Sequence, residues 1–329
     1  MFKKIHRIGL FLVIVLTACV APIAAPVSPP AATTAAVRVI KHALGETEIT
    51  GTPQRIVALE WKYAEDLLAI GLQPVGVADI AGYNEWVKIP VALSPDVVDV
   101  GTRQSPNLEL LASLQPDLIL TASNRVGESY AQLSAIAPTL VFSPYPTDET
   151  VSPYQEMRDV LMLIAEITNR HSEGEAALAR LDQKFADARA ILESAGLLGE
   201  KFILAQGFTA DNAATVRLFI ENAMAIQIIE QIGLELGWNS GWQQYGFSTV
   251  SVEELPALGD LHFFYVVQDD DNIFASEAVK PLWDQLEFVK HDHAYPLGGG
   301  TWLFGGPLSA EVLVDMVVTA LVPGAAVAQ

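Results

Sequence analysis

One long amphipathic helix is predicted near the middle of the chain, at residues 152–169. Ser152 can cap its first turn, Pro153 suits the first helical position, and Gln155 completes a capping box with Ser152. Apolar residues then recur with helical spacing along one face, at Met157, Val160, Leu161, Ile164 and Ile167. A single helix of this length can serve as a rigid connection between two halves of a protein.

Short apolar strands and helices alternate on both sides of this helix. Before it, strands are expected at 55–60, 74–79, 97–101, 117–122 and 139–142, with helices at 63–70 and from residues 107 and 128. After it, a Ser172/Glu175 capping box predicts a further helix, and the remaining strands are expected at 201–207, 261–268 and 294–297, with helices at 222–232, 251–258 and 309–321. Near-continuous apolar strands that alternate with helices indicate mostly parallel sheets covered on both faces. The fold class is therefore α/β, with two lobes joined by the helix at 152–169.

The N-terminus has the features of a secretion signal. Three basic residues precede an apolar run at 8–16 that is too short to span a bilayer comfortably. The only cysteine follows at once in Leu16-Thr17-Ala18-Cys19, which resembles a bacterial lipoprotein signal cleaved before a cysteine that carries the lipid. The alternative is an ordinary signal peptide followed by a chance cysteine. Residues 20–36 are rich in Ala, Pro and Thr and uncharged, which predicts a flexible tether.

These patterns predict five regions. They are a signal peptide at 1–18, a lipidated N-terminus and tether at 19–52, an N-terminal α/β lobe at 53–151, the connecting helix at 152–170 and a C-terminal α/β lobe at 171–329. The formal net charge is −20, from 39 acidic and 19 basic residues, which argues against a nucleic-acid partner because binding to phosphates depends on basic charge.

Two α/β lobes leave a cleft beyond the carboxyl ends of their strands, where ligands of such sheets bind. Arg103 and Arg125 each follow a predicted strand, whereas Arg217, Tyr245 and Trp302 lie in stretches expected to be irregular. A lone loop arginine is usually a solvated surface charge. Three arginines are expected at the cleft, with aromatic residues beside them. A ligand site and solvated surface charges are therefore equally favoured interpretations.

Four segments closely resemble ferric siderophore-binding lipoproteins of ABC importers. They are RIVALEWKYAEDLLAIGLQPVGVAD (55–79), VVDVGTRQSPNLELLASLQPDLIL (97–120), YGFSTVSVEEL (245–255) and GGGTWLFGGPLSAEVLVDMV (298–317). The resemblance extends over about residues 53–321 and is closest to the branch that binds hydroxamate siderophores, both the ferrichrome type and the mixed citrate–hydroxamate type such as schizokinen. It implies a class III periplasmic binding protein fold, whose two lobes hold an iron complex already wrapped by its chelator. No cofactor, no metal ligand from the protein and no enzymatic activity are then expected.

The resemblance also implies roles for particular residues. Arg103 resembles the family arginine that donates to hydroxamate oxygens, Tyr245 occupies a position where relatives often carry Trp, and Trp302 matches an aromatic at the cleft. Arg125 and Arg217 fall where citrate–hydroxamate binders place further guanidinium groups. Three weaker candidates are Trp61, which is equally suited to the core, Tyr83 and Trp86.

By the same resemblance, one surface glutamate on each lobe engages the permease subunits. These are Glu109 and Glu253, each at the second position of a capped helix. A purely structural explanation carries similar weight, because the helix dipole favours carboxylates in the first turn whatever they contact. The expected molecule is a monomeric, extracytoplasmic receptor, anchored to a membrane through Cys19.

Four other functions remain to be weighed, and a receptor for another metal chelate is the first of them. A receptor for bare Zn²⁺ or Mn²⁺ would need convergent ligands, but His291-Asp292-His293 and the acidic run 269–271 are interpreted as solvated loops. An enzyme is disfavoured because the sequence lacks a Gly-x-Ser-x-Gly elbow, a phosphate loop and a dinucleotide fingerprint. A non-transport surface lipoprotein would have no affinity for small molecules.

Overall fold

The structure is a computed structural model that describes residues 36–325. Its first sheet has five parallel strands in the order β5-β4-β3-β6-β7. The strands are β3 (Ile56–Ala58), β4 (Gly76–Val77), β5 (Val98–Asp99), β6 (Leu118–Ala122) and β7 (Thr139–Phe142). Alternate residues of β6 enter different apolar clusters, with Leu118 and Leu120 on one face and Ile119 on the other. Both faces are therefore buried, which explains the near-continuous apolar strands.

The helices of the first lobe follow these strands in turn. They are α1 (Trp61–Ala69), α2 (Ile80–Trp86), α3 (Leu108–Ser113), α4 (Ser123–Val126), the short 3₁₀ helix η1 (Gly127–Ser129) and α5 (Tyr130–Ile136). Asp79 caps α2 and Asn107 caps α3, each by accepting a hydrogen bond from a backbone N–H of the first turn. The predicted βα alternation of this lobe is present in the structure.

The second sheet is mixed, with the order β11-β9-β8-β12-β13 and β10 paired to β8. The strands are β8 (Lys201–Ala210), β9 (Ala213–Phe219), β10 (Glu235–Leu236), β11 (Phe247–Val250), β12 (His262–Val266) and β13 (Ala294–Pro296). The sequence interpretation missed β9 and β11, which pair antiparallel. Asp211 and Asn212 make the tight β8–β9 turn at φ values of 48° and 61°, a region that Asn and Asp tolerate. The prediction of mostly parallel pairing thus describes the first sheet fully and the second only in part.

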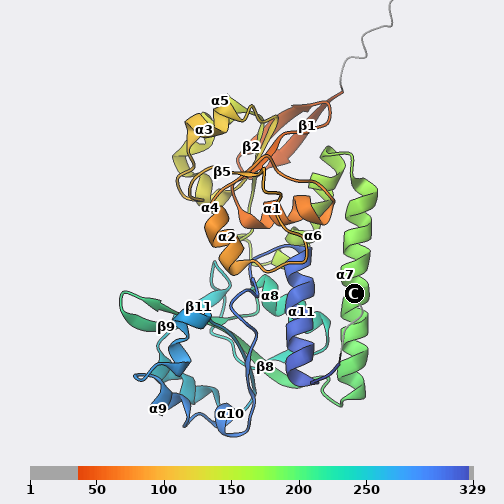
Figure 1. Cartoon of the computed structure of the whole chain (residues 1–329). Helices are drawn as coiled ribbons and strands as arrows, with labels where there is room; N and C mark the ends of the chain where they lie inside the picture. The colour runs from red at the N-terminus through yellow and green to blue at the C-terminus, as the bar shows by residue number, and fades with distance from the viewer. Residues whose placement is uncertain (1–35, 326–329) are drawn as a thin grey trace, which may run out of the picture. The chain divides into compact units, whose positions relative to one another are not determined.

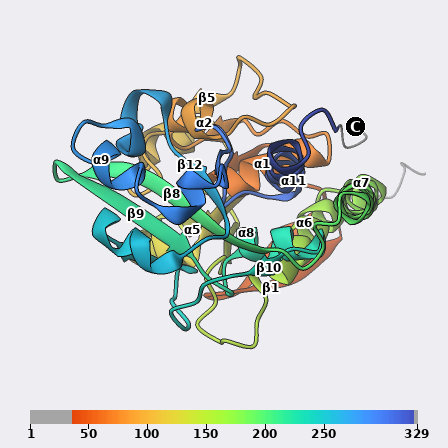
Figure 2. The same ribbon diagram turned by 90° about the horizontal axis from the view of Figure 1, so that it is seen from below.

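The helices of the second half include three long ones. Those after β7 are α6 (Pro153–Ile167), α7 (His171–Ser194), α8 (Met224–Gln231), η2 (Val252–Leu258), η3 (Asp269–Asp271), η4 (Ile273–Ala275), α9 (Lys280–Trp283), α10 (Glu287–Lys290) and α11 (Pro307–Leu321). Figure 1 shows α11 alongside α7, and Figure 2 shows α6, α7 and α11 grouped on one side of β8 and β9. The segment 251–258, predicted as an α-helix, is the 3₁₀ helix η2, and it contains Pro256.

The connecting helix α6 forms almost as predicted. Its five predicted apolar residues are buried, and the Ser152 hydroxyl accepts a hydrogen bond from the backbone N–H of Gln155 at 3.1 Å. The side chain of Gln155 donates to Asp159 at 2.8 Å instead of closing the capping box. The box predicted at Ser172 is wrong, because α7 begins at His171 and the Ser172 hydroxyl donates to Glu173.

An N-terminal hairpin replaces part of the predicted tether. Strands β1 (Val37–His42) and β2 (Gly45–Thr50) pair antiparallel within the region 19–52, so the folded body begins before residue 53. The hairpin is fastened to β7, where the Ala43 N–H donates to Val141 at 2.8 Å and the Thr47 hydroxyl donates to Thr139 at 3.0 Å. Ile49 is buried in the same apolar cluster as Leu118 and Leu120 of β6. The predicted signal peptide, Cys19 and the rest of the predicted tether to residue 35 lie outside the described residues.

The two lobes share a buried contact besides α6. Glu65 of α1 accepts hydrogen bonds from the backbone N–H of Ser309 at 2.7 Å and from its hydroxyl at 2.6 Å. A carboxylate of the first lobe thereby caps α11 of the second half, and both residues are almost fully buried. In residues 36–325, no helix is long and apolar enough to cross a membrane.

Candidate functional site

A cleft of about 430 Å³ lies between the lobes and is lined from both. The first lobe contributes residues just beyond the carboxyl ends of its strands: Glu60 follows β3, Arg103 follows β5, Asn124 and Arg125 follow β6, and Tyr145 follows β7. The second half contributes Arg217 from β9, Phe247 from β11 and the loop residues Tyr245, Trp302 and Phe304. The parallel strands of the first lobe thus converge at their carboxyl ends on this cleft, the place where ligands of such sheets bind.

Two arginines of the first lobe share one carboxylate. Arg125 donates through Nε to Glu60 at 2.7 Å, and Arg103 donates through Nη1 to the other oxygen of Glu60 at 3.4 Å. The Arg103 guanidinium also lies over the Trp61 ring, 3.7 Å from its centroid. Stacking and ion pairing together orient the guanidinium before any ligand arrives.

The arginine of the second half is held differently. The Arg217 guanidinium lies 4.7 Å from the Phe208 ring centroid and 4.6 Å from that of Phe247, and it donates to the Gln206 side chain at 3.0 Å. Burial lowers the pKa of Arg217, although a guanidinium stays charged in proteins. Arg217 belongs to β9 rather than to the irregular stretch that the sequence predicted.

Aromatic side chains form much of the remaining wall. The Trp302 ring centroid lies 5.0 Å from that of Trp61 and 5.2 Å from that of Phe304. Tyr145 and Tyr245 meet across the lobes, edge to face, with centroids 5.2 Å apart. Burial raises the pKa of Tyr145, and Glu60 adds to this effect, so its phenol remains neutral and can donate a hydrogen bond.

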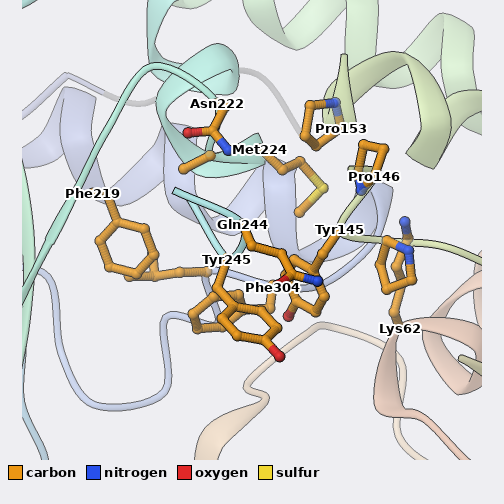
Figure 3. Close-up of a pocket in the computed structure, with 13 residues that line it drawn as sticks. Lys62, Tyr145, Pro146, Pro153, Phe219, Asn222, Met224, Gln244, Tyr245 and Phe304 are labelled. Atoms are coloured by element: carbon orange, nitrogen blue, oxygen red, sulfur yellow. The ribbon is translucent and has the colours of Figure 1, made fainter. Parts of the chain in front are cut away.

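A narrow recess of about 30 Å³ adjoins the cleft (Figure 3). It shares Tyr145, Tyr245 and Phe304 with the cleft and continues toward Met224 and the proline residues of the first lobe. Lys62 is common to both spaces, but it is almost fully buried and forms an ion pair with Glu156. The recess is therefore mostly apolar, with room for about one small group.

Six of the eight predicted ligand-binding residues line the cleft. They are Arg103, Arg125, Arg217, Tyr245, Trp302 and Trp61. Trp61 is also a core residue, 3% exposed, whose indole N–H donates to the Ala78 carbonyl at 3.1 Å. Tyr83 is buried behind Trp61, and Trp86 packs on Trp302, so neither lines the cleft.

The sequence interpretation missed several residues that the structure brings to the cleft. These are Glu60, Lys62, Tyr63, Gln104, Asn124, Pro144, Tyr145, Phe247 and Phe304. Glu60 is the last residue of a predicted strand and Tyr145 follows another, so both lie at the strand ends that selected Arg103 and Arg125. Applied to every strand end, that rule would have found both.

The acidic and histidine-rich loops make protein contacts. His291 and His293 each bond through Nδ1 to a different oxygen of Asp260, both at 2.8 Å. Asp271 accepts from the Thr209 backbone N–H at 2.7 Å and from its hydroxyl. Within residues 36–325, no group of three or more His, Cys, Asp or Glu side chains is arranged to hold a metal ion.

The two predicted docking glutamates are exposed on the two lobes. Glu109 lies in the first turn of α3. Glu253 lies in the first turn of η2, where Ser251 and Glu254 form the predicted capping box. In both positions the carboxylate projects from a capped helical turn, as the resemblance requires and as the helix dipole alone would also favour.

Comparison with known proteins identifies the family. The family model described as "Periplasmic binding protein" matches residues 56–298. The Fe(3+)-citrate-binding protein YfmC of Bacillus subtilis is 30% identical over 83% of this chain and 82% of its own. The iron(3+)-hydroxamate-binding protein FhuD of Escherichia coli is 29% identical over 82% of this chain and 87% of its own. The crystal structure of FhuD from Vibrio cholerae with bound Fe³⁺-Desferal superposes with a TM-score of 0.73 at 26% identity, covering 82% of this chain and 98% of that one. This α/β chain, with its interlobe cleft, belongs to the periplasmic binding protein family.

Proposed function

We propose that this protein is the extracytoplasmic substrate-binding component of an ABC importer and captures a ferric hydroxamate-type siderophore in the interlobe cleft. The observation that carries the proposal is the convergence of three guanidinium groups, from both lobes, on an aromatic cleft in a chain of net charge −20. A protein of this net charge exerts no long-range attraction on a neutral or anionic chelate, so binding must depend on these short-range groups.

The chemistry of the cleft fits a wrapped iron complex. Planar guanidinium groups donate forked hydrogen bonds to the paired oxygens that a chelator presents around iron. The faces of Trp302 and Phe304 can cover apolar chelator arms. In this proposal the chelator fills the coordination sphere of iron, so the protein needs neither a metal ligand nor a cofactor and performs no chemical conversion.

The relatives support a chelate ligand but differ in its class. Two FhuD proteins carry hydroxamate or Fe³⁺-Desferal in their names, whereas YfmC is named for Fe(3+)-citrate. Ferric citrate is therefore the second candidate ligand.

The lipid anchor at Cys19 is supported by the Bacillus subtilis relative YfiY, named a probable siderophore-binding lipoprotein, which is 30% identical over 97% of this chain. That the receptor is monomeric stays a prediction.

A tryptophan-fluorescence titration tests the ligand class directly, because Trp61 and Trp302 lie in the cleft. Residues 36–329, which form one compact unit, would be titrated with ferrichrome, ferric schizokinen, ferric citrate, Zn²⁺ and Mn²⁺. We expect saturable quenching by the hydroxamates with a Kd of about 1 μM or lower, equivalent to roughly 8 kcal/mol. Trp302→Phe should lose most of the signal, whereas Trp238→Phe, outside the cleft, should keep it.

Three results of this titration would refute the proposed hydroxamate ligand. A response to Zn²⁺ or Mn²⁺ with none to any chelate would assign the protein to the bare-metal receptors. Silence toward every compound would instead favour a surface lipoprotein without a transport role. Tighter binding of ferric citrate than of any hydroxamate would select the second candidate.

If Glu109 and Glu253 dock the protein on its permease, replacing them should impair transport but leave ligand binding intact. Replacing both by Lys should lower siderophore uptake at least about tenfold, because complementary charges fix the encounter and register of two proteins. Ligand affinity should stay unchanged, since neither residue lines the cleft. Glu193→Lys on α7, also exposed, serves as the control for a single charge reversal away from the two proposed contacts. Normal uptake in the double variant would exclude both contacts.

A further inference from the structure

Glu60 is the carboxylate in the wall of a cleft whose other charged groups are mainly cationic. It occupies the position directly before α1, with extended backbone angles of φ −133° and ψ 142°, where short polar side chains usually cap the helix. The Glu60 side chain makes no such capping bond. It reaches into the cleft instead and is 14% exposed.

Glu60 accepts hydrogen bonds from only some of the N–H donors of the two first-lobe arginines. Its oxygens engage Nε of Arg125 at 2.7 Å and Nη1 of Arg103 at 3.4 Å. These contacts leave the Arg125 terminal nitrogens and the second Arg103 terminal nitrogen for oxygens of a ligand. Glu60 therefore orients both guanidinium groups without occupying all of their donors.

Glu60 also lowers the charge of the cleft. Its carboxylate offsets one of the two guanidinium charges of the first lobe, and Asp79 lies 3.8 Å from Arg103 Nε. Lys62 is paired with Glu156 and adds no net charge. The first-lobe wall is thus close to neutral, while Arg217 on the opposite wall is held by aromatic rings and an amide.

We propose that Glu60 is a specificity-determining residue that makes the cleft select ferric chelates of little or no net charge over polyanionic ones. The inference rests on the proposed function. Three hydroxamates balance the charge of ferric iron, a citrate–hydroxamate chelate keeps a single excess negative charge, and citrate chelates keep more. A carboxylate fixed in a partly desolvated wall repels each additional negative charge on a chelate. This repulsion discriminates against polyanionic chelates.

The test compares Glu60→Gln with the wild-type protein for three chelates of increasing charge. Dissociation constants would be measured for ferrichrome, ferric schizokinen and ferric dicitrate. In Glu60→Gln we expect the preference for ferrichrome over ferric dicitrate to fall about tenfold or more, with ferric schizokinen intermediate. The shift should be larger at low ionic strength, because salt screens charge interactions.

Two further variants separate charge from shape. Glu60→Asp keeps the charge and should retain a preference close to that of the wild-type protein. Glu60→Gln combined with Arg125→Gln removes one negative and one positive charge, so it should return the preference toward the wild-type value. Glu193→Gln removes the same charge from α7, which does not line the cleft, and should leave the preference unchanged.

The possible failures are distinguishable. An equal loss of affinity for all three chelates in Glu60→Gln, or a preference that changes less than about twofold, would overturn the role of Glu60 in selectivity. A wild-type protein that binds none of the chelates would refute the proposed function itself, and this inference with it.

Discussion

Arg103→Ala is expected to lower the affinity for a ferric hydroxamate about 100-fold, or roughly 3 kcal/mol. The Arg103 side chain is only 15% exposed, stacked on Trp61 and tied to Glu60, so its donors are oriented before binding. Its loss would remove forked donors from the cleft and leave Glu60 with one partner fewer. Isothermal titration calorimetry with ferrichrome and ferric schizokinen would measure the change.

Two variants sharpen the interpretation of the Arg103 result. Arg103→Lys keeps the charge but loses the planar fork, so its affinity should fall between those of the wild-type and Ala variants. Arg189→Ala removes an exposed arginine from α7 and should bind normally. Unchanged affinity in Arg103→Ala would place the ligand elsewhere and contradict the site.

Asp66→Asn is expected to stabilise the protein at neutral pH, because a buried amide stays uncharged without having to hold a proton. Asp66 is fully buried beside the interlobe contact, and neither of its carboxyl oxygens has a hydrogen-bond partner among the described residues. Burial raises the pKa of Asp66 well above its usual value, and Glu65 and Glu156 add to this effect, while Lys62 opposes it. At pH values between the pKa of the unfolded chain and the raised folded pKa, the folded protein therefore retains a proton on Asp66 that the unfolded chain releases.

The sign of the pH dependence follows from that difference in proton binding. Any stability that protonated Asp66 provides is fully present below the pKa of the unfolded chain, and it is lost as the pH rises through the raised folded pKa. Asn carries no ionisable group, so the advantage of Asp66→Asn should be small near pH 4 and grow toward pH 8. Urea denaturation at several pH values would measure it, with the exposed Asp96→Asn as control. A difference that is constant across this range would contradict the proton linkage.

The architecture of the first lobe and the connecting helix could be predicted from the amino-acid sequence alone. Strands buried on both faces must be apolar throughout, and a packed helix must repeat its apolar residues every three to four positions, so both are visible locally. The placement of Arg103 and Arg125 followed from the same rule, because residues after parallel strands gather at one sheet edge. Hairpin β1–β2 was missed, because residues 19–52 were predicted to be a tether, although its alternating apolar and polar residues are a local signal.

Which side chains form the cleft and which remain behind it depends on tertiary packing. Tyr83 and Trp86 lie near Trp61 and Trp302, yet the packing of those two rings keeps them out of the cleft. Strand β9 carries Arg217 to the cleft by pairing with β8 and β11, and such pairing depends on partners rather than on the strand's own pattern. The contacts of Glu60 with Arg103 and Arg125 join residues 43 and 65 positions apart in the sequence. Long-range contacts of this kind leave no periodic signal, because they exist only once the strands are assembled side by side.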